Sequence, residues 1–192
     1  MLGLFGKSKK KTIVVVTLNA RLQPMDRAPL EDALDAFMEQ RGHGMRVVGG
    51  GTLQQPSGEI KECDIEMEVD NPTDARLTLL INVLESMLAP IGSTLHIPGQ
   101  QGIDFGRQHG LAIYVNGTDL PASVYETCDI NHVVDEFGRL LEGVGLVASN
   151  WQGPQDTALY IYGDDFETMV SRLKPFLDSY PLLERCRMER VA

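Results

Sequence analysis

The side chains best suited to hold a ligand lie in one short polar segment, residues 19–27. This segment follows a β-branched run and precedes a helical pattern, so it is predicted to be a loop at one end of a sheet. Its polar groups could converge on a small anion or on a protein partner: Asn19, Arg21, Asp26 and Arg27. A loop that only connects a strand to a helix would have a similar composition, and both interpretations stay open.

Three consecutive glycines, Gly49, Gly50 and Gly51, form a second candidate site. Bare backbone allows a ligand or another backbone to approach closely, but glycine also serves a β-bulge. A phosphate site would need an adjacent lysine or helix start, and neither stands beside this run. The run therefore indicates either a bulge that leads into the loop 52–61 or a close approach.

Carboxylates alternate with apolar residues in "ECDIEMEV", residues 62–69. Side chains on one face of a strand lie roughly 6.6–7 Å apart, so Asp64, Glu66 and Glu68 continue an acidic row that begins at residue 62. Such a row favours water, cations or a basic partner. No histidine or turn completes a metal-binding pattern, and we predict neither a metal nor a cofactor.

The second half of the chain has tyrosines where the first half has carboxylates. Tyr160 and Tyr162 align with Glu66 and Glu68, and the single tryptophan, Trp151, ends the preceding predicted strand. An aromatic sheet face should not stay bare. It could pack on the first half or on a second subunit, as in a homodimer, or it could bind a partner directly.

No catalytic residue is predicted. The chain lacks the GxSxG, HExxH and GxGxxG patterns. The "GKS" at residues 6–8 resembles the end of a phosphate loop, but no strand precedes it. An enzyme that uses Asp26, Arg27 or His43 is a minor hypothesis.

The elements that must position these residues occur twice. "VTLNARLQP" at 16–24 aligns with "IYVNGTDLP" at 113–121, and "CDIEMEV" at 63–69 parallels "TALYIYG" at 157–163. The glycine run aligns with residues 150–152, which are not glycines, so the repeat as such does not require glycine there. We interpret this similarity as an internal duplication.

Each copy shows the order β-α-β-β-α-β, the split βαβ pattern. The fold class is therefore α+β, with two tandem ferredoxin-like repeats, each an antiparallel four-stranded sheet with helices on one face. In the first copy, the predicted strands are 12–18, 45–48, 62–69 and 93–97, and its first helix is 30–41. The domains are a disordered basic tail at 1–11, repeats at 12–97 and 111–192, and a glycine-rich linker at 98–110.

Charge and cysteine content limit the classes of partner. The chain of 192 residues has a net charge of −10, which disfavours nucleic acid because phosphate contacts need a basic face. No apolar run approaches the ~20 residues of a membrane span, so we expect no membrane partner. Three cysteines without close spacing indicate a reducing cytoplasm.

Several stretches carry a family resemblance: "LNARLQPMDR", "VVGGGTLQ", "EIKECDIEMEV" and "APIGSTL" in the first half, and "NGTDLP", "WQGPQDTALYIYG" and "YPLLERCRMERV" in the second. Together they resemble an uncharacterised bacterial family with tandem ferredoxin-like repeats, associated with immunity partners of secreted bacterial toxins. The resemblance covers nearly the whole chain after the tail and implies no catalytic residues.

Two functions follow from the sequence. The first is a non-catalytic cytoplasmic binding protein that recognises another protein, and a toxin-immunity protein with a basic partner is one form of it. The alternative is a regulatory domain that binds a small ligand or cation between the repeats.

Overall fold

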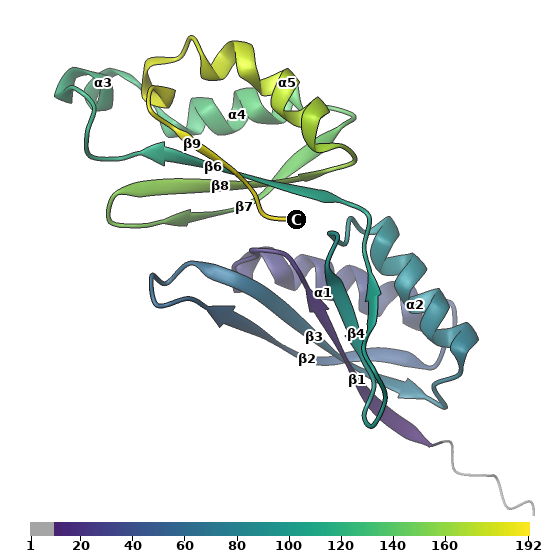
Figure 1. Ribbon diagram of the computed structural model, residues 1–192. Coiled ribbons are helices and arrows are strands. Elements are labelled where there is room, and N and C mark those ends of the chain that lie inside the picture. Colours follow the sequence, from purple (N-terminus) through teal and green to yellow (C-terminus); the bar gives the residue numbers. More distant parts are fainter. Residues whose placement is uncertain (1–9) are drawn as a thin grey trace, which may run out of the picture.

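The computed structural model describes residues 10–192, which form two α+β units (Figure 1). Residues 1–9, with most of the predicted basic tail and the "GKS" motif, lie outside the described residues. In the described part, no helix is both long and apolar enough to cross a membrane.

The first unit has the predicted order of elements and a ferredoxin-like sheet. Its elements are β1 (Lys11–Leu18), α1 (Pro24–Gln40), β2 (Met45–Gln54), β3 (Ile60–Asp70), α2 (Asp74–Ser86) and β4 (Ser93–His96). A further strand, β5 (Ile103–Phe105), pairs antiparallel with β4, so the sheet has five strands in the order β2-β3-β1-β4-β5. The segment predicted as a linker, 98–110, thus contributes β5 to the first sheet and the first two residues of β6 (His109–Asn116) to the second.

Alternation in β3 separates the two faces of this sheet as predicted. Cys63, Ile65, Met67 and Val69 are fully buried and pack with α1 and α2 in one core. The carboxylates between them lie on the opposite, open face.

Helix α1 begins at Pro24, six residues before the predicted start. The first turn contains Pro24 and Asp26, residues typical of a helix start, but no apolar periodicity that would have shown it. The residues from the predicted loop 19–27 therefore divide between a short loop and the first turn of α1.

The second unit repeats the architecture. It contains β6 (His109–Asn116), α3 (Ala122–Thr127), α4 (Ile130–Leu140), β7 (Gly145–Gln152), β8 (Asp156–Gly163), α5 (Phe166–Leu177), the 3-10 turn η1 (Pro181–Leu183) and β9 (Arg187–Arg190). The strand order β7-β8-β6-β9 matches β2-β3-β1-β4 of the first unit. Helices α4 and α5 cover one face of this sheet (Figure 1).

Equivalent bulges support the duplication. The β2–β3 register shifts between Val47 and Gly49, and the β7–β8 register shifts between Val147 and Ser149. Glu66 pairs with Gly49 as Tyr160 pairs with Ser149, so the predicted match of Glu66 with Tyr160 is confirmed. The predicted alignment of the glycine run was wrong by one residue, because the bulges make it structurally equivalent to residues 149–151.

The two units meet end to face. The open face of the second sheet lies over the end of the first unit where β1 ends and β3 begins (Figure 1). Ala112, Tyr114, Ala158, Tyr160 and Tyr162 from this face belong to the same buried cluster as the core of the first unit. The second sheet is thereby covered on both faces, whereas the first keeps one face open.

Candidate functional site

A buried carboxylate stands at the centre of the contact between the units. The β2–β3 hairpin carries Glu59, whose side chain is only 12% exposed. Its Oε1 atom accepts hydrogen bonds from Arg21 Nη1 at 2.5 Å and from the hydroxyls of Tyr114 and Tyr160 at 2.7 Å each. Three donors, one of them charged, offset the desolvation of this carboxylate.

The tyrosines of this cluster remain protonated donors at neutral pH. Burial, assisted by the neighbouring Glu59 carboxylate, raises the pKa of Tyr114 to about 12 and also raises the pKa of Tyr160. The guanidinium of Arg21 lies 5.6 Å from the centre of the Tyr160 ring. The cluster therefore holds one charge pair and two neutral hydroxyls.

The backbone of the β1–α1 loop is held by the second sheet as well. The Arg21 N–H donates to the Tyr162 hydroxyl at 2.8 Å, and its carbonyl accepts from Ser149 Oγ. The side-chain amide of Gln23 donates to the Asn150 carbonyl at 3.3 Å. These contacts fix the loop against β7 and β8.

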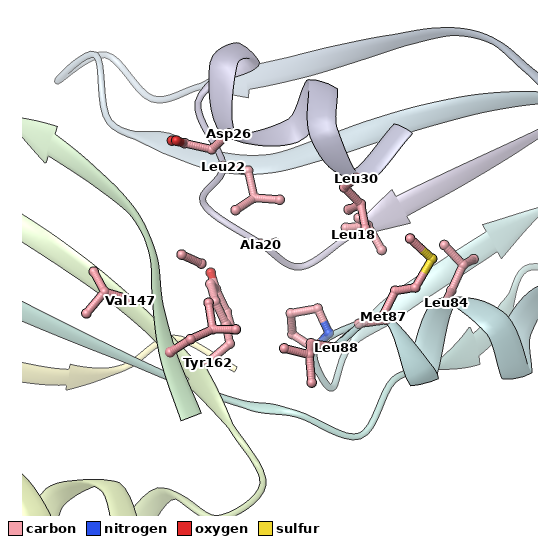
Figure 2. Close-up of a pocket in the computed structure, with 14 residues that line it drawn as sticks. Leu18, Ala20, Leu22, Asp26, Leu30, Leu84, Met87, Leu88, Val147 and Tyr162 are labelled. Atoms are coloured by element: carbon pink, nitrogen blue, oxygen red, sulfur yellow. The ribbon is translucent and has the colours of Figure 1, made fainter. Parts of the chain in front are cut away.

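Beside these contacts, a mostly apolar, partly open cavity of about 260 Å³ lies between the units (Figure 2). Figure 2 shows Tyr162 and Val147 on one side and Leu18, Leu22 and Leu30 on the other. The full lining is Leu18, Ala20, Leu22, Asp26, Leu30, Leu84, Met87, Leu88, Ala89, Pro90, Leu146, Val147, Ala148 and Tyr162. A hollow with many apolar walls and few polar groups is typical of a small-molecule site, although this one is slightly below the usual ~300–1,000 Å³.

Asp26 and Tyr162 supply the side-chain polar groups of this cavity. Burial raises the pKa of the Asp26 carboxyl, while a hydrogen bond with the backbone of Gln23 acts in the opposite direction. Burial also raises the pKa of Tyr162 to about 12. At neutral pH, the cavity therefore offers a carboxyl group and a neutral hydroxyl.

Leu88 lines the cavity in a strained backbone conformation. Its φ of +69° is left-handed, a region that costs a residue with a side chain roughly 1–2 kcal/mol. Leu88 directly follows Met87, the C-cap residue of α2. Glycine is the usual residue at the position after a C-cap. The Leu88 side chain lines the cavity and is 36% exposed.

Two other residues of the predicted loop serve the first unit itself. Asn19 Nδ2 donates to the Ile91 carbonyl at 2.8 Å. Arg27 Nε pairs with Glu31 at 2.8 Å, and its Nη1 donates to the Gly51 carbonyl and, at 2.7 Å, to Thr52 Oγ1. Asn19 and Arg27 therefore make their contacts within the first unit, and recognition of an anion or a partner by Asn19, Arg21, Asp26 and Arg27 stays a hypothesis.

The contacts of Arg27 also explain the glycine run. A Cβ atom at Gly50 would lie 2.4 Å from Glu31 Oε1 and 2.6 Å from the Asp64 carbonyl. A side chain at position 50 would clash with the backbone of β3 and with the Arg27–Glu31 ion pair of α1, which lies against the strand. The neighbouring Gly49 faces the Glu66 carboxylate, and Gly51 has open space around it.

The acidic row is partly neutralised within the sheet. Glu68 accepts from Lys11 at 2.7 Å and from Arg46 at 2.9 Å, and these bonds lower the pKa of its carboxyl. Asp64 accepts from Thr17 Oγ1 at 2.7 Å. Glu66 is exposed on the open face. The row therefore presents less free charge than its sequence suggests.

The aromatic face is an internal surface of the chain. Tyr160 and Tyr162 are 1% and 3% exposed because the first unit covers them, which excludes them as an open platform for a partner. Trp151 is half-buried and packs against the same cluster. Of the alternatives for this face, packing on the first half is the one that the structure shows.

The residues of the enzyme hypothesis do not come together. His43 stacks on Phe37 at 6.1 Å, beyond the C-terminal end of α1, whereas Asp26 and Arg27 lie in its first turns. A helix of 17 residues is roughly 25 Å long. Within residues 10–192, no group of three or more histidine, cysteine or acidic side chains could hold a metal ion.

Glu59, which stands at the contact between the units, was missed by sequence reasoning. Glu59 lies in "PSGEIK", a typical hairpin sequence, and its tyrosine partners are 55 and 101 residues away. No local spacing marks such a residue.

No protein-family model matches the chain, and no curated protein matches it. Among solved structures, it is similar to the first two RRM domains of the yeast poly(U) binding protein Pub1, with 10% identity, a TM-score of 0.25, and coverage of 94% of this chain and 99% of that one. It is also similar to a mutant chlorite dismutase from Candidatus Nitrospira defluvii (10% identity, TM-score 0.31, coverage 93% and 87%) and to protein BT0572 from Bacteroides thetaiotaomicron (8%, 0.27, 95% and 93%). With TM-scores this low, these matches bear on neither ligand nor partner.

Proposed function

We propose that this protein is a non-catalytic binding protein that holds a small, mainly apolar ligand between its two repeats. The observation that carries the proposal is the cavity of about 260 Å³, whose walls come from β1, α1 and α2 of one unit and from β7 and β8 of the other. Ligand sites occur preferentially at such contacts between domains.

Binding in this place would be linked to the packing of the repeats. A ligand in the cavity touches both units, so it stabilises the packed arrangement by an amount that grows with ligand concentration. This is the behaviour of a regulatory domain. The three cysteines described are all free, which agrees with a cytoplasmic setting for this role.

A thermal-shift screen of the full chain against metabolites and divalent cations tests the proposal. Ala148 is half-buried and lines the cavity, so Ala148→Phe should fill it and abolish the shift caused by any hit. Ala36→Phe, on the exposed side of α1, is the matched control and should leave that shift unchanged. A flat response of the wild type to every compound, or an equal response of both variants, would contradict the proposal.

Protein recognition through the open face of the first sheet is a second candidate. Ile13 and Val48 on this side of the sheet are 42% and 43% exposed and lie near the exposed Glu66. A mixed apolar and acidic surface fits a basic protein, and an immunity partner of a toxin is one form of this function.

Co-purification from the native host tests this second candidate. A basic partner should be retained at low salt and released at high salt, and Glu66→Lys should weaken its retention. Glu142→Lys, an equal charge change on the second unit, should not. If no protein is retained at low salt, this function is excluded.

A further inference from the structure

The second sheet has an open edge that is covered in the first sheet. Strand β9 ends the order β7-β8-β6-β9 and occupies the place that β4 has in the first unit (Figure 1). In the first unit, β5 pairs antiparallel with β4 and covers its outer side. Within residues 10–192, no strand lies on the outer side of β9, and all four of its residues are exposed. Such an edge is a template for pairing with a further strand.

Backbone hydrogen bonds show which residues of β9 face this open edge. The Gly110 N–H donates to the Ala192 carbonyl at 2.9 Å, and the Gly110 carbonyl accepts from the Val191 N–H at 2.9 Å. Backbone groups of successive strand residues point to opposite sides, so the even-numbered residues of β6 face β9. Because Ala112 pairs with Glu189 in the register, the odd-numbered residues of β9 face β6 and the even-numbered ones face outward.

The side chains of β9 lie on two faces of the sheet. Arg187 lies on the face of Tyr114, with its guanidinium carbon 3.8 Å from the centre of that ring, and it also pairs with Glu189. The side chains of Arg187 and Glu189 are 51% and 44% exposed, so the first unit, which buries Tyr114, leaves this edge accessible. Met188 lies on the opposite face and is 45% exposed. The edge thus presents an apolar side chain between two of opposite charge.

A second copy of the chain offers a strand that fits this edge in one register. Since only even-numbered residues face outward, a two-fold antiparallel pair of β9 strands places one residue on the axis, opposite its own copy. An axis at Arg187, Glu189 or Arg190 sets like charges opposite each other, which is destabilising. An axis at Met188 instead sets each Arg187 opposite the partner's Glu189. These two form a non-hydrogen-bonded pair, the kind in which facing side chains are closer.

We propose that the protein forms a two-fold dimer in which β9 pairs antiparallel with β9 of a second copy, with Met188 on the axis. The N–H of each Met188 donates to the carbonyl of the partner's Met188, and the two four-stranded sheets join into one. The two pairs of Arg187 and Glu189 combine into a network of alternating charge. A four-residue strand buries little area, so the dimer is weak and depends on concentration. This contact is separate from the cavity and does not depend on the proposed ligand.

Reversing one charge at a time tests the register by sedimentation velocity of the full chain, from micromolar to submillimolar concentration. The wild type should approach twice the mass of one chain. Arg187→Glu leaves two glutamates on the edge and Glu189→Arg leaves two arginines, so each variant alone should dimerise at least tenfold more weakly. An equimolar mixture of the two restores both opposite-charge pairs and should dimerise as the wild type does. Glu126→Arg, an equal charge change at an exposed residue of α3, should leave the dimer unchanged.

A wild type that stays monomeric overturns the proposal, because the edge then does not serve self-association. Dimers that persist in both reversed variants overturn it as well, since the copies then meet elsewhere. A mixture that stays monomeric rejects the register with Met188 on the axis.

A proline variant tests the backbone contact without relying on charge. Met188→Pro removes an N–H that faces the open edge, a place where proline is tolerated in sheets, so the fold should persist while the dimer is lost. Met188→Leu keeps both the N–H and an apolar side chain, and it should dimerise as the wild type does. Circular dichroism checks that every variant is folded. If Met188→Pro is folded and dimerises as well as Met188→Leu, β9 is not the contact and the proposal is overturned.

Discussion

Removing the carboxylate of Glu59 is expected to loosen the contact between the repeats. Glu59→Ala deletes the acceptor of three hydrogen bonds and leaves the Arg21 guanidinium, 17% exposed, without its ion-pair partner. Breaking a fully buried pair in this way costs about 3–5 kcal/mol. Because Arg21 keeps some contact with water, we expect about 2–4 kcal/mol less stability.

The loss of stability should be smaller when position 59 retains a hydrogen-bond acceptor. Glu59→Gln keeps an oxygen for the hydroxyls of Tyr114 and Tyr160 but loses the charge that pairs with Arg21. A hydrogen bond to a neutral acceptor contributes about 0.5–1.5 kcal/mol, against about 1.5–3 kcal/mol to a charged one. We therefore expect a loss of about 1–2 kcal/mol for this variant.

Trp151 provides the assay, because it is the only tryptophan and lies at the contact between the repeats. Urea denaturation of Glu59→Ala should be monitored by the fluorescence of Trp151 and, in parallel, by far-UV circular dichroism. The fluorescence transition should occur at a lower urea concentration than the circular-dichroism transition. Glu62→Ala removes a carboxylate that is 3.7 Å from Lys61 and 30% exposed, so it should change stability by less than about 0.5 kcal/mol. The reasoning is refuted if Glu59→Ala is as stable as Glu62→Ala by both probes.

Three further predictions concern backbone and tyrosine chemistry. Gly50→Ala should cost about 1–3 kcal/mol in urea denaturation, because its Cβ would lie 2.4 Å from a carboxylate oxygen, whereas Gly51→Ala, with 3.9 Å of space, should be nearly neutral. The free energy of unfolding of Leu88→Gly should stay within about 1 kcal/mol of the wild-type value, since relief of left-handed strain offsets lost burial. The variant should nevertheless weaken the binding of a ligand found in the thermal-shift screen. The pKa values of Tyr114 and Tyr162 are raised to about 12, so the folded state keeps protons that the unfolded state loses above pH 10. The free energy of unfolding should therefore fall between pH 10 and 12. Replacing either tyrosine by Phe should make that fall smaller in a series of unfolding measurements at alkaline pH.

Most of the fold could be predicted because most of its elements have a local period. Alternation in β3 identified its buried face, and the alignment of "CDIEMEV" in β3 with "TALYIYG" in β8 supported the duplication. Helix α1 was predicted to begin six residues too late, since its first turn carries Pro24 and Asp26 and no apolar periodicity. Strand β5 was missed because three residues between glycines have no detectable period, and only pairing with β4 makes them a strand.

The site could be predicted only in fragments. Sequence reasoning selected Arg21, Tyr160 and Tyr162 for different reasons and assigned them to separate surfaces. The structure joins them through Glu59, which no spacing rule connects to residues up to 101 positions away. Gly50 is a similar case, because the need for glycine comes from a helix that crosses the strand and is absent from the local sequence.

The end-to-face arrangement of the repeats explains why equivalent positions carry opposite chemistry. Tyr160 and Tyr162 form the face that receives the end of the first repeat, with Glu59 at its centre. Tyrosines at Glu66 and Glu68 would give the first sheet the same receptive face, and a contact of this heterologous kind can propagate from chain to chain into a filament. The carboxylates oppose such growth, because an incoming Glu59 would meet like charge instead of hydroxyl donors.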